Sequence, residues 1–429
     1  MNIVSEKVNT IQFPANVFQL DNGLTVIHQY LSSTPVVVTD VWVKAGAIRE
    51  PDKWFGMAHF LEHMIFKGTN NIPPGAFDWI IENSGGMTNA ATSHDYAHFY
   101  ITTAADYLPN TLPHFAEILL QAAINDEEFV RERDVVLEEI RCCQDDPDWI
   151  GYQAMCETVY GNHPYGRSVL GKETDLLDHT PNQMRCFHKT HYQPENITVA
   201  IVGGVEQETA LSLVNKAFSS FSVRSECPPI SLPVLPKLEG INRTHLRLPR
   251  IAQSRLLMAW TAPGIDSEGN VPFQDAFTLD VISVLLASGR SSRLVKELVE
   301  EKHLALDISS DFSLQSHATL FTVSAWLESS NLEVVEELIR ERIEQLRREP
   351  VSEVELSRCQ RLLCNDYAFS TETPGQLAGL YGYYHTIARA ELSITYPYYI
   401  QQLSPEDIQR VACKYLDSER YGVAVLEPV

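Results

Sequence analysis

Residues 180–205 read TPNQMRCFHKTHYQPENITVAIVGGV, and residues 403–429 read LSPEDIQRVACKYLDSERYGVAVLEPV. In each stretch an amphipathic helical pattern leads into a short apolar run that is typical of a buried strand. Ser404 is expected to cap the second helix, because a proline and two acidic residues follow it in the first turn. The two stretches therefore close two similar halves of the chain, with a chance recurrence of a common unit as the alternative.

The two halves also begin alike. The first half opens with VFQLDNGLTVIHQY and VVVTDVWVKAGA, and the second opens with THLRLPR and SRLLMAWTAPG. All four segments favour strands, and helical patterns follow them in both halves. The order of strands, helices and a closing strand predicts a duplicated α+β fold with two homologous domains.

Residues 225–240, SECPPISLPVLPKLEG, divide the chain nearly in half. The segment holds four prolines and shows little periodicity, which is typical of an extended linker. We therefore expect an N-terminal domain in residues 1–224 and a C-terminal domain in residues 241–429. A chain of 429 residues is long enough for two domains of this size.

The composition excludes several classes of protein. A net charge of -23 disfavours nucleic acid as a partner, because the clustered Lys and Arg that neutralise phosphates are missing. The charge suits basic peptides, although an acidic solvating surface explains it equally well. No apolar run reaches membrane-spanning length, and no secretory signal or presequence pattern is present, so we expect a cytoplasmic protein without a membrane span. The eight cysteines form no CxxC pair and are expected to be reduced.

The segment GMAHFLEHMIFKGT contains two histidines and a glutamate in the order His-x-x-Glu-His. Its apolar spacing predicts a helix over residues 55–67 that stops at the following glycine. His59 and His63 are then four residues apart on one face, where two neutral imidazoles can bind one zinc ion. Glu62 is one position away and can reach water at that metal.

A catalytic zinc site needs a third protein ligand and an open position for water. The predicted helix of residues 126–147 is the best source, because Glu132 and Glu139 lie on nearly the same face. A His-x-x-Glu-His helix followed by a glutamate in a context like ERDVVLEEI resembles the pitrilysin, insulinase and mitochondrial processing peptidase family of zinc metallopeptidases. The segments SGGMTNAATSHDYAHFYI, HPYGRSVLG, YQPENITVAIVGG, ASGRSSRL and VAVLEP also match this family, so the resemblance covers nearly the whole chain.

The resemblance implies two homologous domains, each a mixed, largely antiparallel sheet with helices packed on it, and one zinc ion per chain. By position it implies Glu139 as the third zinc ligand and Glu132 as its companion in catalysis. Glu138 is a rival ligand by sequence. It lies about 100° around the helix from Glu139 and off the face of Glu132, so Glu139 is preferred.

The activity that the resemblance implies is hydrolysis of peptide bonds in unfolded peptides. Zinc held by His59, His63 and Glu139 would lower the pKa of water, and Glu62 would take the proton as general base. One alternative is a non-catalytic assembly subunit, which would not require Glu62 beside the two histidines. The other alternative is a zinc hydrolase of a non-peptide substrate.

Residues 86–104 have the threonine and aromatic content of a strand with small residues at one end. The resemblance implies that this strand is a sheet edge to which extended substrate adds through main-chain hydrogen bonds. Asn89 and Ala90 occupy the positions that contact substrate in the family. The alternative is an ordinary edge strand whose small residues only pack closely.

The chain departs from the family pattern in its second half. Self-sufficient members carry an Arg followed by a Tyr there, and this chain has Val299 and Leu306, which cannot donate a hydrogen bond to an oxyanion. Arg290 and Arg293 lie nearby in the sequence and are possible substitutes. In two-subunit members a homologous chain without zinc supplies the missing pair. The resemblance therefore predicts that this chain is the zinc-bearing subunit of a heterodimer, with a homodimer as the alternative.

Overall fold

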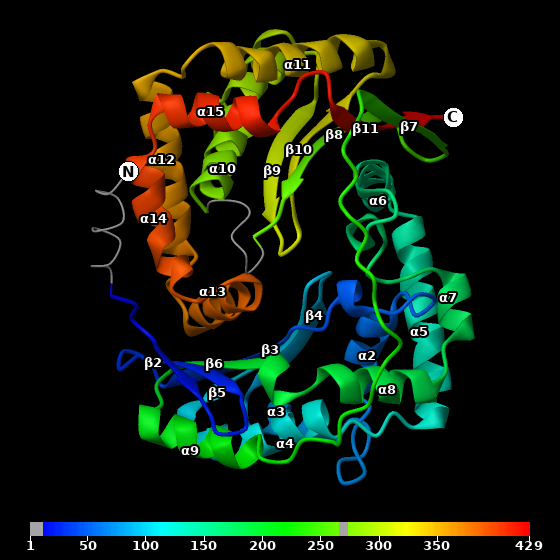
Figure 1. Ribbon diagram of the computed structural model, residues 1–429, viewed down its shortest axis with the longest axis vertical. Helices are drawn as coiled ribbons and strands as arrows, with labels where there is room; N and C mark the ends of the chain where they lie inside the picture. Colours follow the sequence, from blue (N-terminus) through cyan, green and yellow to red (C-terminus); the bar gives the residue numbers. More distant parts are fainter. Residues whose placement is uncertain (1–11, 266–272) are drawn as a thin grey trace. The chain divides into compact units, whose positions relative to one another are not determined.

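The computed structural model describes residues 12–265 and 273–429, and these fall into two compact units (Figure 1). Unit 1 consists of the described residues up to Arg141 together with Ser168–Leu232 and Phe369–Ile394. Unit 2 consists of Cys142–Arg167 and of the described residues of Pro233–Ala368 and Thr395–Val429. Each unit contains one β-sheet.

The sheet of unit 1 has six strands in the order β1-β2-β6-β3-β5-β4. Strands β2 and β6 are parallel, and every other neighbouring pair in this sheet is antiparallel. Strand β4 therefore forms one edge of the sheet. The strands are β1 (Asn16–Gln19), β2 (Thr25–Tyr30), β3 (Val36–Val43), β4 (Met87–Thr92), β5 (Ala97–Ala104) and β6 (Ile197–Gly203).

The sheet of unit 2 has five strands in the order β7-β11-β8-β10-β9. They are β7 (Ile241–Leu248), β8 (Ser254–Pro263), β9 (Asp307–Leu314), β10 (Ala318–Leu327) and β11 (Tyr421–Pro428). Strand β11 is parallel to β7 and antiparallel to β8, as β6 is parallel to β2 and antiparallel to β3. The predicted α+β fold is confirmed: it has two largely antiparallel sheets, and these share this arrangement of strands.

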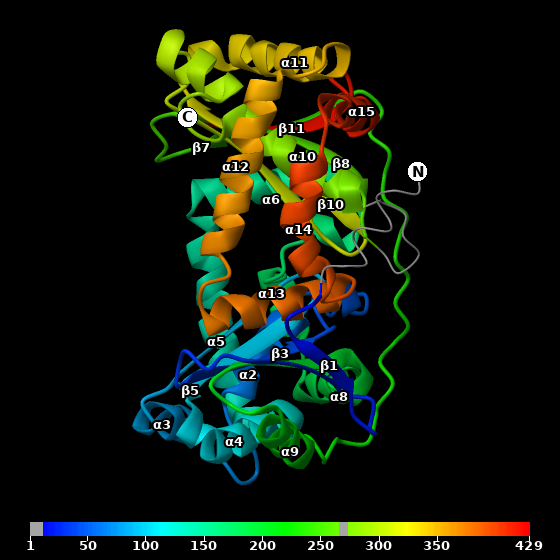
Figure 2. The same ribbon diagram turned by 90° about the vertical axis from the view of Figure 1, so that its left-hand side faces the viewer.

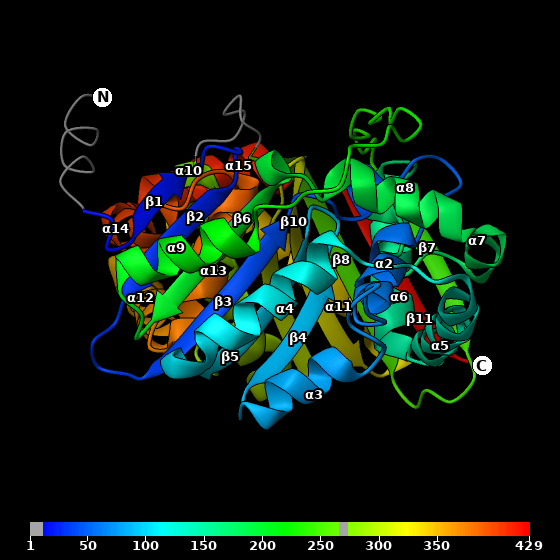
Figure 3. The ribbon, with the colours of Figure 1, turned by 90° about the horizontal axis from the view of Figure 1, so that it is seen from below.

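The helices of the first half begin with α2 (Met57–Ile65) and α3 (Ala76–Asn83). The rest are α4 (Leu108–Leu120), α5 (Asp126–Gln144), α6 (Pro147–Tyr160), α7 (Glu173–Asp178), α8 (Pro181–His191) and α9 (Gln207–Ala217), with short 3-10 turns η1 (Ala47–Arg49), η2 (Ala105–Tyr107), η3 (Pro164–Gly166) and η4 (Pro194–Asn196). Figure 3 shows α4 and α9 lying across one face of the sheet of unit 1. Their apolar side chains join those of α2, α5 and α8 in one buried cluster on that face.

The helices of the second half are α10 (Phe273–Ala287), α11 (Leu332–Arg348), α12 (Glu353–Phe369), α13 (Pro374–Ile387), α14 (Leu392–Gln402) and α15 (Pro405–Tyr415), with a π-helical segment η5 (Val295–Glu301) and a 3-10 turn η6 (Ser329–Asn331). As predicted, Ser404 caps α15 by accepting a hydrogen bond from the Asp407 backbone N–H. Thr180 caps α8 in the same way. None of the helices in the described ranges is long and apolar enough to cross a membrane, and the expected cytoplasmic location stays a prediction.

Each unit takes one helix from the other half of the chain. Helix α6 packs on β7, β8 and β11 in unit 2, whereas α13 packs on β3 and β6 in unit 1 (Figure 2). The reason is burial: the residues of β3 and β6 are buried on both faces of the sheet, and α13 covers the face opposite the large cluster. The compact units thus cut across the expected domains 1–224 and 241–429. Residues 225–240 form no helix or strand, as expected for a linker.

Residues 86–104, predicted as one strand, form a hairpin of β4 and β5. The prediction was wrong because Ser93, His94 and Asp95 make a turn, which the Ser93 N–H closes on the carbonyl of Tyr96 at 2.7 Å. The hairpin brings only its first strand, β4, to the edge of the sheet.

We expect Gly382→Ala to lower the free energy of unfolding by about 1–3 kcal/mol, the usual cost of overpacking. Gly382 lies in α13, and a Cβ added there would be 2.1 Å from the indole Nε1 of buried Trp42 on β3. Urea denaturation followed by tryptophan fluorescence measures the change.

The matched control is Gly379→Ala, one turn earlier in α13. Its added Cβ would meet only Asp40 Oδ2, at an ordinary contact distance of 3.9 Å. Because alanine is the better helix former, this variant should gain about 0.5–1 kcal/mol. A Gly382→Ala protein as stable as Gly379→Ala would contradict the packing described here.

Candidate metal centre

Helix α2 carries His59, Glu62 and His63. It spans Met57–Ile65, two residues shorter at each end than predicted, and Gly68 follows in the left-handed conformation with φ 92°. The apolar side chains of α2 are buried in the large cluster of unit 1. The packing fixes the helix, so the three polar side chains on its other face hold fixed positions.

The N-terminus of α2 is held by Glu50, which is 2% exposed. Its carboxylate accepts hydrogen bonds from the backbone N–H groups of Gly56 at 3.1 Å and of Ala58 at 2.9 Å. A buried carboxylate there satisfies two N–H groups that the helix leaves unpaired and complements the helix dipole. Sequence reasoning missed Glu50, because it lies outside the local spacing of capping motifs.

Helix α5 brings Glu139 to the two histidines of α2. Glu139 Oε1 lies 3.6 Å from His59 Nε2, and Glu139 Oε2 lies 3.4 Å from His63 Nε2. Ligand atoms of these three residues all lie within 4.8 Å of one another, and no other such group occurs among residues 12–265 and 273–429. Glu138, the rival in the sequence, is exposed and pairs with Arg141 at 3.4 Å. The donor set of two imidazoles and a carboxylate fits a zinc ion.

Glu132 lies on α5 behind His63 rather than among the donor atoms. Its Oε1 accepts a hydrogen bond from His63 Nδ1 at 2.9 Å, and its Oε2 pairs with Lys67 Nζ at 2.7 Å. A proton held on Nδ1 leaves Nε2 of the same ring available as a metal donor, and the contact also fixes the ring orientation. Lys67 was not singled out from the sequence, because its partner is on another helix.

The electrostatics of the site differ between the two histidines. Burial lowers the pKa of His59 to about 4, against the opposing charge of Glu139. Burial acts in the same direction on His63, but its hydrogen bonds to Glu132 and Glu139 outweigh burial and raise its pKa to about 9. The bond to His63 in turn lowers the pKa of Glu139. Two carboxylates therefore converge on the histidine pair, an arrangement that favours a bound cation.

Glu62 faces the end of the edge strand β4. Thr92, the last residue of β4, donates its hydroxyl hydrogen bond to Glu62 Oε2 at 2.5 Å. Burial raises the pKa of Glu62, and the Thr92 bond opposes this shift. A carboxylate with a raised pKa is better matched to proton transfer near neutral pH. Thr92 was missed in the sequence, because no local pattern connects it to α2.

Asn89 and Ala90 lie on β4, in the strand that ends beside Glu62. Asn89 is exposed and its Oδ1 accepts a hydrogen bond from the Ala90 N–H at 2.9 Å, while Ala90 packs against the buried cluster. Both residues therefore lie on the sheet edge, in the strand whose last residue contacts Glu62. Their expected contact with substrate stays a prediction.

In unit 2, Val299 lies in the π-helical segment η5, and the side chain of Leu306 is exposed just before β9. Arg290 is paired with Glu300, and Arg293 is paired with Glu355. Both arginines that could have replaced the family's Arg are thus engaged by carboxylates within unit 2.

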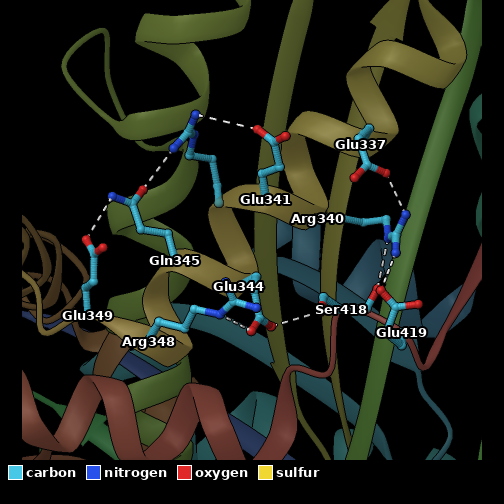
Figure 4. Close-up of a pocket in the computed structure, with 10 residues that line it drawn as sticks. Glu337, Arg340, Glu341, Glu344, Gln345, Arg348, Glu349, Ser418 and Glu419 are labelled. Atoms are coloured by element: carbon cyan, nitrogen blue, oxygen red, sulfur yellow. Dashed lines mark hydrogen bonds and ion pairs between the residues drawn. The ribbon is translucent and has the colours of Figure 1, made fainter.

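A second group of charged side chains lines a surface pocket on α11 and the Ser418–Glu419 turn of unit 2 (Figure 4). Arg340 pairs with Glu337 and Glu419, and Arg348 pairs with Glu344. These surface ion pairs satisfy one another, and each contributes little to stability. They therefore indicate a solvated helix face rather than a binding site.

Two family models match the chain. One, described as insulinase (peptidase family M16), matches residues 25–173. The other, described as peptidase M16 inactive domain, matches residues 178–363. Together they match most of the first half of the chain and part of the second.

Similar proteins include zinc protease PqqE of Helicobacter pylori, which is 31% identical over 417 residues, covering 95% of this chain and 92% of the relative. The uncharacterized zinc protease YmxG of Bacillus subtilis is 24% identical over 417 residues, covering 96% of this chain and 98% of the relative. Among solved structures, a protease from Helicobacter pylori superposes with a TM-score of 0.89 at 28% identity, covering 96% of this chain and 99% of that one. Pitrilysin shares the fold, with a TM-score of 0.79 at 17% identity over 98% of this chain and 45% of its own.

Proposed function

Because the chain belongs to the insulinase (M16) family of peptidases, we propose that it is a zinc-dependent peptidase that hydrolyses peptide bonds of unfolded peptides. The observation that carries the proposal is the approach of His59, His63 and Glu139 to one another, with the partly buried Glu62 on the same helix face. A structural cluster of ion pairs would need no carboxylate in the position of Glu62.

In this proposal His59 Nε2, His63 Nε2 and a Glu139 oxygen are the three protein ligands. Zinc in this position would polarise the peptide carbonyl and lower the pKa of water. Glu132 acts through His63: its hydrogen bond to Nδ1 places the proton of the neutral imidazole on that nitrogen, so that Nε2 is the donor atom once the metal binds, and it holds the ring in place. Glu132 is therefore a positioning residue and does not itself touch the reacting atoms.

Glu62 is the general base. It takes a proton from the attacking water and returns it to the leaving amine as the peptide bond breaks. Thr92 holds one carboxylate oxygen of Glu62 at 2.5 Å, which leaves the other oxygen for the water. The oxygen of Glu62 that does not bind Thr92 is therefore the one that accepts the proton from water.

The substrate is proposed to lie along the edge strand β4 as an added strand, over Asn89 and Ala90. Main-chain hydrogen bonds at this edge would bind an extended chain with little regard to sequence. The strand ends at Thr92, so a peptide in register with β4 would reach Glu62. The net charge of -23 favours basic peptides among the possible substrates.

This chain lacks the Arg and Tyr that self-sufficient family members carry, which supports an enzyme in which a second chain supplies them. Val299 and Leu306 offer no side-chain donor, and Arg290 and Arg293 are engaged by Glu300 and Glu355. We therefore propose a homologous partner without a zinc motif that supplies the pair. The same substitutions favour one competing function, a non-catalytic assembly subunit.

Cleavage of a quenched fluorescent peptide library tests the proposal, with light scattering reporting the mass of the purified chain. We expect cleavage that stops when a chelator removes zinc and returns when zinc is added. Cleavage by the chain alone would remove the need for a partner. Zinc binding without cleavage, even after addition of a homologue that carries the Arg and Tyr, would favour the assembly subunit.

A further inference from the structure

Two cysteines of unit 1 that are not among the metal donors lie side by side. The Sγ atoms of Cys186, on α8, and of Cys227, in the linker, are 3.7 Å apart, and 41 positions separate the residues in the sequence. Neither cysteine is in a disulfide, and both are partly buried against the apolar cluster of unit 1. The pair plays no part in the proposed hydrolysis.

The chain before Cys227 is fastened along α8 by a series of hydrogen bonds. Gln193 donates to the carbonyl of Ser222 at 3.2 Å, and the Thr190 hydroxyl donates to the carbonyl of Ser225 at 3.0 Å. The segment thus runs back along α8 towards Cys186. These bonds hold the two thiols in contact, which is the main entropic requirement for forming a bond between them.

We propose that Cys186 and Cys227 are a redox-active dithiol that a low-molecular-weight disulfide, such as oxidised glutathione, converts to an intrachain disulfide that fastens the linker to α8. A disulfide needs the sulfurs at about 2.05 Å, so they must approach by side-chain rotation and a small shift. Residues 225–240 form no helix or strand, so the linker side can move without breaking an element.

The exchange proceeds in two steps that balance. Cys186 loses its proton and its sulfur attacks the small disulfide, whose S–S bond breaks. A mixed disulfide forms, and one small thiol leaves with the proton that Cys186 released. The Cys227 sulfur then attacks the Cys186 sulfur, the second small thiol leaves, and it takes up the Cys227 proton. Two protein thiols are oxidised and one small disulfide is reduced to two thiols. The Cys227 thiol donates its hydrogen bond to Cys186 Sγ, which favours Cys186 as the first attacker. Burial raises the pKa of Cys227. Because the thiolate is the attacking form, the exchange should accelerate with pH.

The test uses the full zinc-loaded chain in mixtures of reduced and oxidised glutathione. Free thiols are blocked, the protein is digested without reduction, and the peptides are identified by mass spectrometry. We expect a peptide pair joined through Cys186 and Cys227, whose yield rises with the share of oxidised glutathione. Cys186→Ser and Cys227→Ser should each abolish this pair, and the matched control Cys413→Ser, at an exposed cysteine of α15, should retain it.

The oxidised protein should also melt roughly 5–10 °C above the reduced protein, because the disulfide closes a long loop in the unfolded chain. Zinc content measured in parallel should stay unchanged. Free thiols, or separate glutathione adducts on Cys186 and Cys227 with no joined peptides, would overturn the proposal. The single-serine variants would then melt at the same temperature as the wild-type protein in both redox states.

Discussion

Glu62→Gln should retain bound zinc and lose peptidase turnover by about 10²–10⁴-fold, the usual contribution of a general base. Glutamine has nearly the shape of glutamate and still accepts the Thr92 hydrogen bond, so α2 and the metal donors should stay in place. It cannot take a proton from water. The loss should therefore fall on kcat, while KM for a peptide substrate changes little.

Three measurements on one preparation make this prediction specific. Metal analysis gives the zinc content, peptide cleavage gives kcat and KM, and thermal unfolding shows whether the fold is intact. Thr92→Val is the matched control, because it removes the hydrogen bond to Glu62 and leaves the carboxylate present. It should reduce turnover less than Glu62→Gln does. Full activity in Glu62→Gln would exclude the assigned base.

Glu139→Gln should bind zinc more than roughly 100-fold more weakly than the wild type, because losing only a hydrogen-bond partner of a metal ligand already costs up to that much. Activity should be lost with the zinc. Among residues 12–265 and 273–429, the change removes the only carboxylate that faces both imidazole Nε2 atoms. The neutral amide is a poor zinc ligand. Competition with a fluorescent zinc chelator measures the affinity directly, without requiring turnover.

Two neighbouring glutamates of α5 provide the comparison series. Glu132→Gln should weaken zinc binding by about 10–100-fold, because it disturbs only the hydrogen bond that orients His63. Glu138→Gln, on the exposed face, should bind zinc as the wild type does. If Glu138→Gln lost zinc and Glu139→Gln kept it, the assignment of the third ligand would be wrong.

The sequence by itself determined the features that depend on local chain geometry. Helical spacing placed His59 and His63 on one face of α2, and the cap at Ser404 placed the start of α15. The apolar runs located most strands, and the motifs identified the family. These predictions succeed because residues a few positions apart have relative positions fixed by the backbone conformation alone.

The tertiary structure decided what depends on packing between distant segments. It brought helix α5 to α2, and with it Glu139, which the sequence had already favoured over Glu138. It placed Thr92 against Glu62 and buried Glu50 at the start of α2. It also split residues 86–104 into a hairpin and exchanged α6 and α13 between the two units. No local periodicity encodes these contacts, because they arise where separate elements bury shared apolar surface and satisfy each other's polar groups.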